Sequence, residues 1–107
     1  MAYKVLREDS FEHDYIQVVD YLAEQLHSSQ AAKHFILSMR NAASVLQATP
    51  FVCAISTKGI LADYEMREYF VDNYVIVYRI DEKEHQVKLH RLFHQLQQYD
   101  DEWYWKE

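Results

Sequence analysis

Hydrophobic positions recur with a helical period in the first half of the chain and with a strand period in the second. Residues 3–7 form a plausible short first strand. In segment 9–26 the apolar residues follow at steps of one, three and four, which predicts an amphipathic helix with the stripe Phe11, Tyr15, Val18, Val19, Leu22 and Leu26. Asp9 or Ser10 is expected to cap this helix, with Glu12 in capping-box spacing from Asp9.

A second helix is predicted to begin after Ser28 or Ser29, either of which can cap it. Its apolar stripe is Ala32, Phe35, Ile36, Met39, Ala43 and Leu46. The helix should end near Ala48, because the residue before Pro50 disfavours helical geometry. The short connection between the helices predicts an antiparallel helical hairpin.

The period changes to two after a mostly irregular crossing at 51–63, in which Gly59 is expected to be a turn point. Strands are predicted at 64–70, 74–80 and 86–94, and 74–80 is almost continuously apolar, as a central strand is. The predicted fold class is α+β, with an N-terminal strand and an antiparallel helical hairpin packed on a mostly antiparallel sheet. That sheet ends in a three-strand meander.

The length of 107 residues predicts a single domain, expected to span 1–107 with an acidic, aromatic tail at 99–107. We interpret the tail as docked on the body through its tryptophans, or else as covering a basic surface or contacting a partner. The lone Cys53 is interpreted as a small buried hydrophobe, and it cannot form an internal disulfide. Since no secretory segment or membrane-length apolar stretch is present, a cytoplasmic protein without a membrane partner is expected.

The net charge of −6 opposes non-specific binding to nucleic acid, which depends on neutralising phosphates. The distribution still allows a locally basic face, because residues 25–62 contain no acids and the strand region adds Arg67, Arg79, Lys83, Lys88 and Arg91. A metal site from His90 and His94 is set aside, since four residues of strand span about 13 Å. With one glycine, no phosphate-binding loop is possible, and no cofactor is expected.

Residues 66–80 read Met-Arg-Glu-Tyr-Phe-Val-Asp-Asn-Tyr-Val-Ile-Val-Tyr-Arg-Ile. This run resembles the pattern of the RelE/ParE family of bacterial toxins, with Arg67, Tyr74, Tyr78 and Arg79 on its signature positions. The order of the predicted elements is also similar to that fold, and Val87 to His94 resembles its last strand. Two features depart from the family: the arginines that often follow the histidine are missing, and the chain is acidic whereas RNA-cleaving members tend to be basic.

The resemblance implies the toxin of a type II toxin–antitoxin system, a growth inhibitor that stabilises a plasmid or chromosome and is neutralised by a cognate antitoxin. The acidic balance and the missing arginines favour the ParE-like branch, whose members bind gyrase. The alternatives are a RelE-type ribosome-dependent mRNA endonuclease and an inactive member that only binds antitoxin, so whether the chain is an enzyme is left open. The antitoxin is expected on the apolar surface of the hairpin or on the run 51–55.

For RelE-type cleavage the resemblance implies that Arg67 holds the phosphate, that His94 is the general acid and that Glu68 or Glu65 is the general base. The target- or RNA-binding residues are expected to be Arg91, Tyr74, Arg79 and Lys88. The structural alternatives are an ion pair of Arg67 with Glu65 or Asp72, and an ordinary hydrogen bond at the strand end for His94.

Overall fold

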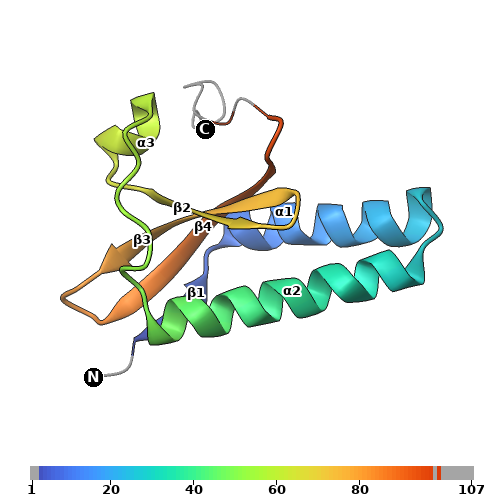
Figure 1. The fold of residues 1–107 in the computed structure, drawn as a ribbon, viewed down its shortest axis with the longest axis horizontal. Coiled ribbons are helices and arrows are strands. Elements are labelled where there is room, and N and C mark those ends of the chain that lie inside the picture. The colour runs from blue at the N-terminus through green and yellow to red at the C-terminus, as the bar shows by residue number, and fades with distance from the viewer. Residues whose placement is uncertain (1–2, 98, 100–107) are drawn as a thin grey trace.

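The computed structural model describes residues 3–97 and 99, and within them it shows a four-stranded sheet with α1 and α2 on one face (Figure 1). The elements in chain order are β1 (Lys4–Arg7), α1 (Asp9–Asp20), the π-helix η1 (Tyr21–Gln25), α2 (Ser29–Ala48), α3 (Gly59–Asp63), β2 (Arg67–Val71), β3 (Tyr74–Asp81) and β4 (Gln86–His94). The strand order is β1-β4-β3-β2, with β1 parallel to β4 and the other pairs antiparallel. The predicted α+β fold class is confirmed.

Strand β3 is buried on both faces, which explains its nearly continuous apolar sequence. Ile76 and Tyr78 pack in the cluster that the sheet forms with α1 and α2. Val75 and Val77 point the other way and pack with Leu61 of α3 and with other apolar residues from outside the helical hairpin. The sheet therefore lies between a large helical layer and a smaller apolar cluster on its second face.

Local signals place the ends of α2 where the sequence predicts them. The Ser28 hydroxyl accepts a hydrogen bond from the Ala31 N–H at 3.0 Å, so Ser28 caps the helix. The helix ends at Ala48, with Thr49 as its C-terminal cap directly before Pro50. The hairpin and the helix boundary at Pro50 are confirmed.

The start of α1 differs from the prediction. Glu8 occupies the cap position and makes no capping hydrogen bond through its side chain. The Ser10 hydroxyl donates instead to the His90 carbonyl at 2.6 Å, so it joins α1 to β4 rather than capping the helix. The predicted cap by Asp9 or Ser10 is wrong because a contact distant in sequence takes the hydroxyl.

The predicted apolar stripe of the first helix also breaks at its far end. Residues Tyr21–Gln25 form a π-helix, whose wider turns rotate the following side chains away from the α-helical stripe. Leu22 remains buried, whereas Leu26 is 52% exposed. The assignment of Leu26 to the buried stripe is therefore wrong.

The crossing between α2 and the meander is more ordered than predicted, since it contains α3. This helix is closed by a hydrogen bond from the Met66 N–H to the Leu61 carbonyl at 2.8 Å, with Glu65 in the left-handed region at a φ of 55°. The following strand consequently begins at Arg67 and not at Tyr64. Across the described residues, none of the helices combines the length and apolarity needed to cross a membrane.

Candidate functional site

Arg67 lies at the start of β2 and fastens the crossing segment to the sheet. Its guanidinium donates a hydrogen bond to the Cys53 carbonyl and lies 5.1 Å from the centre of the Phe51 ring. The predicted structural alternative was an ion pair with Glu65 or Asp72, but Asp72 lies 3.3 Å from the His34 imidazole instead. The observed contacts of Arg67 therefore hold the segment between α2 and β2 against the sheet.

Glu68 points to the opposite face of the sheet from Arg67, as neighbouring residues of a strand do. It accepts hydrogen bonds from the Tyr99 hydroxyl and from the Lys58 ammonium, the latter at 3.1 Å. Burial raises the pKa of Glu68, but the hydrogen bonds from Tyr99 and Lys58 outweigh it and leave the pKa below its ordinary value. A carboxylate held in its ionised form by these donors is a weak proton acceptor.

His94 ends β4 on the face that the helices cover. It is the cross-strand partner of Tyr74, and the two ring centres lie 5.6 Å apart at nearly a right angle. The Leu96 N–H donates to His94 Nδ1 at 3.1 Å, so the neutral imidazole carries its proton on Nε2. An ordinary hydrogen bond at the strand end is therefore present, as the structural alternative predicts.

The strand register separates Arg67 from His94. Arg67 is opposite Tyr78, whereas His94 is opposite Tyr74, which pairs with Val71. The offset of four residues along β3, from Tyr74 to Tyr78, corresponds to about 13 Å along the sheet, and β3 lies between β2 and β4. The three predicted catalytic residues therefore lie apart from one another and do not form one catalytic site.

A buried ion pair that the sequence did not predict joins α1 to β4, and its arginine lies three residues before His94 in sequence. Asp14 of α1 is 8% exposed and accepts hydrogen bonds from Arg91 Nε at 2.7 Å, from Arg91 Nη2 at 3.1 Å and from the Leu92 N–H at 3.0 Å. Aspartate is usually exposed to solvent, and Asp14 is not part of the predicted apolar stripe. Its spacing of three residues after Phe11 and four before Val18 is nevertheless that of the apolar stripe, and this is the signal that could have identified it.

Arg79 and Lys88 lie near the other end of the β3–β4 pair and each has an acidic neighbour. Arg79 lies 3.6 Å from a Glu8 oxygen, and Lys88 lies 3.6 Å from an Asp81 oxygen. The second Glu8 oxygen lies 2.9 Å from His90 Nδ1. The basic face expected from the sequence is therefore interleaved with carboxylates.

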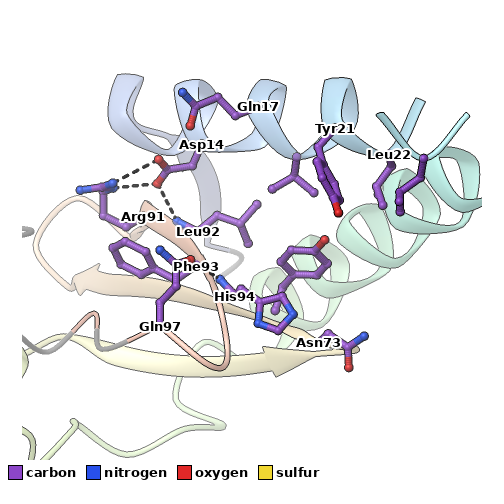
Figure 2. A pocket seen from close by; sticks show the side chains of 13 residues that line it. Asp14, Gln17, Tyr21, Leu22, Asn73, Arg91, Leu92, Phe93, His94 and Gln97 are labelled. Atoms are coloured by element: carbon purple, nitrogen blue, oxygen red, sulfur yellow. Dashed lines mark hydrogen bonds and ion pairs between the residues drawn. The ribbon is translucent and has the colours of Figure 1, made fainter. Parts of the chain in front are cut away.

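A cleft of about 750 Å³ opens between the α1–η1 helices and the ends of β3 and β4, as Figure 2 shows. Of the predicted site residues, Tyr74, Arg91 and His94 line this cleft, and the others do not. Its helical wall is mainly apolar and includes Val18, Tyr21, Leu22 and Leu26. Its sheet wall, which includes Asn73 and Leu92, carries amide, phenol and imidazole groups. Burial raises the pKa of Tyr74, and the nearby Tyr21 phenol adds to the rise.

The chemistry of the cleft is that of hydrogen bonding and apolar contact. Arg91, its permanent cation, is bound to Asp14, and the remaining polar side chains are amides, phenols and one imidazole. Within residues 3–97 and 99, no group of three or more histidine, cysteine, aspartate or glutamate side chains is placed to hold a metal ion. The arrangement suits an uncharged group with an apolar body.

Comparison with known proteins identifies the family. The family model for the ParE toxin of the type II toxin–antitoxin system parDE matches residues 5–99 of this chain. The chain therefore belongs to this toxin family and is a type II toxin. The solved toxin–antitoxin complex RelBE2 from Mycobacterium tuberculosis is similar in fold, with a TM-score of 0.62 and 17% identity over 88% of this chain and 99% of that chain. No curated protein sequence gives a significant match. The resemblance to RelE/ParE toxins is confirmed.

Proposed function

We propose that this toxin inhibits growth by binding a target protein, as the ParE-like branch does with gyrase, and not by cutting RNA. The separation of Arg67, Glu68 and His94 carries the proposal. Cleavage of a phosphodiester by its neighbouring hydroxyl requires a cation, a proton acceptor and a proton donor around one phosphate. Here Arg67 holds the Cys53 carbonyl, Glu68 lies on the other face and His94 lies at the far end of the sheet.

The electrostatics support a protein target. Binding of an RNA strand draws most of its affinity from phosphate neutralisation by lysine and arginine. In this chain Arg79, Lys88 and Arg91 each have a carboxylate within 4 Å, and the net charge is −6. A phosphate backbone would have to compete with these acids, whereas a neutral or basic protein surface would not.

A supercoiling assay tests the proposal. Purified gyrase would convert relaxed plasmid to supercoiled plasmid in the presence of rising amounts of the folded chain. We expect inhibition that depends on dose and that is relieved when the cognate antitoxin is added. Full supercoiling at a large molar excess of the chain over gyrase would contradict the proposal for this target.

We further propose that the cognate antitoxin binds along the outer side of β2 and the run 51–55. Strand β2 is at the edge of the sheet, and within the described residues its outer side has a single β-bridge, between Ile55 and Arg67. Phe51, Val52 and Phe70 are large apolar residues in this region and are 50%, 54% and 55% exposed. An extended segment that adds to an edge strand and fills apolar positions beside it is an established mode of peptide recognition.

A matched pair of variants distinguishes this surface from the helical hairpin. Val52→Glu places a charge in the proposed surface, whereas Leu37→Glu places one on α2 at a residue that is 56% exposed. We expect Val52→Glu to weaken co-purification with the antitoxin at least about tenfold and Leu37→Glu to leave it within about twofold. The reverse result would move the antitoxin to the hairpin.

A further inference from the structure

The helical wall of the cleft has two large side chains with apolar surface exposed to solvent. Tyr21 and Leu26 line the cleft and are 51% and 52% exposed. Leu22, between them in sequence, is buried in the core. The π-helix η1 produces this arrangement because its extra residue turns Leu26 toward the cleft, and π-helical turns occur frequently at functional sites.

A second, shallower hollow adjoins the cleft across Gln17 and Tyr21, which line both. Its other lining residues are Asp20, Glu24 and Gln25, so it is acidic where the cleft is apolar. Asp20 and Glu24 are exposed, and within the described part of the chain neither forms an ion pair. The acids Glu8, Asp14 and Asp81 differ in this respect, since each has a basic partner.

The apolar cleft and the acidic hollow together indicate which chemical groups could bind there. A phosphate group is disfavoured because Arg91 is bound to Asp14 and the neighbouring carboxylates would repel it. An uncharged aromatic or branched apolar side chain matches the cleft, and a lysine or arginine matches the hollow. Since the cleft and the hollow adjoin and share Gln17 and Tyr21 as lining residues, both groups must be close neighbours on the partner, as residues three or four apart on a helix are.

We propose that the cleft and the acidic hollow together bind one helical peptide segment of a partner protein, with an aromatic or branched apolar residue in the cleft and a lysine or arginine three or four residues away over Asp20 and Glu24. The inference rests on the proposed function and deepens it, because it gives the chemistry of the target segment that the toxin grips. Gln17 and Tyr21, which line both the cleft and the hollow, lie between the two anchoring groups.

The test uses the full chain labelled with nitrogen-15 and a synthetic helical peptide with one tryptophan flanked by arginines at the third and fourth positions on either side. We expect saturable shifts of the backbone amides of Leu22, Asn73 and Leu92 and a Kd of about 100 μM. A peptide with glutamates in place of the arginines should bind at least about tenfold more weakly.

Two matched pairs of variants test each half of the surface. The double variant Asp20→Lys with Glu24→Lys should weaken the basic peptide at least about tenfold, whereas Glu82→Lys with Glu84→Lys, the same change of charge in the β3–β4 turn, should act less than about twofold. For the cleft, Leu26→Ser should weaken binding at least about threefold. Its control Leu37→Ser, at a similarly exposed leucine, should have no effect.

Several results would overturn the inference. These are equal binding of the acidic and basic peptides, shifts confined to amides away from the cleft, absence of saturation up to about 1 mM, or displacement of the peptide by a single-stranded RNA oligonucleotide. The peptide measurement contains no gyrase. Peptide binding without inhibition of supercoiling would therefore reject gyrase as the target, and inhibition without peptide binding would reject this surface.

Discussion

The buried pair of Asp14 and Arg91 provides the sharpest prediction of stability. Asp14→Ala removes the acceptor of two guanidinium hydrogen bonds and of the Leu92 N–H, all between α1 and β4. Breaking a buried pair from one side costs about 3–5 kcal/mol, and the lower end applies because 22% of the Arg91 side chain is exposed. We expect a loss of about 3 kcal/mol, equivalent to a fall in Tm of about 12 °C for a chain of this size.

Urea and thermal unfolding followed by circular dichroism would measure this effect. Asp14→Asn retains one carbonyl acceptor for the Leu92 N–H, so a smaller loss of about 1.5 kcal/mol is expected. The control is Glu12→Ala, which removes the exposed pair with Arg7 at 3.1 Å and should change the free energy of unfolding by less than about 0.5 kcal/mol. Equal effects of Asp14→Ala and Glu12→Ala would refute the reasoning.

Three further predictions concern single side chains. Glu68→Gln should destabilise the chain by about 1.5 kcal/mol at pH 7. Because the folded pKa of Glu68 lies below its ordinary value of 4.5, the difference in stability between the variant and the parent chain should disappear as the pH falls through that folded pKa. Urea midpoints measured at pH 7 and in acid would show this. Tyr78→Phe removes the buried hydrogen bond to the Pro50 carbonyl and should cost about 1–2 kcal/mol in thermal unfolding. Ser28→Ala removes the cap of α2 and should cost about 1 kcal/mol, with faster amide exchange in its first turn. No change in Tm for either of the last two variants would contradict the roles assigned to these hydroxyls.

The features that the sequence predicted well depend on neighbouring residues. The Ser28 cap and the helix end before Pro50 follow from the chemistry of one helical turn. Strand β3 was predictable because its nearly continuous run of β-branched and aromatic residues is typical of a central strand. The features missed locally, η1 and α3, are single short turns whose stability comes from packing against the rest of the fold.

The candidate site was harder to predict because it depends on strand register. The tight turn at Asp72 pairs Val71 with Tyr74, and counting back from it places Arg67 opposite Tyr78, so this half of the separation was available in the sequence. The register of β4 was not, since it shifts between Val77 and Tyr78. The pair of Asp14 and Arg91, 77 residues apart, likewise requires the folded arrangement.

The central claim, binding of a target protein without RNA cleavage, is tested most directly by mapping mRNA 5′ ends in a reconstituted bacterial translation reaction with and without the purified chain. The account predicts no new ends, because Arg67, Glu68 and His94 do not meet around one phosphate. New cuts in phase with codons that require ribosomes and disappear in His94→Ala would contradict it and establish the chain as an endonuclease.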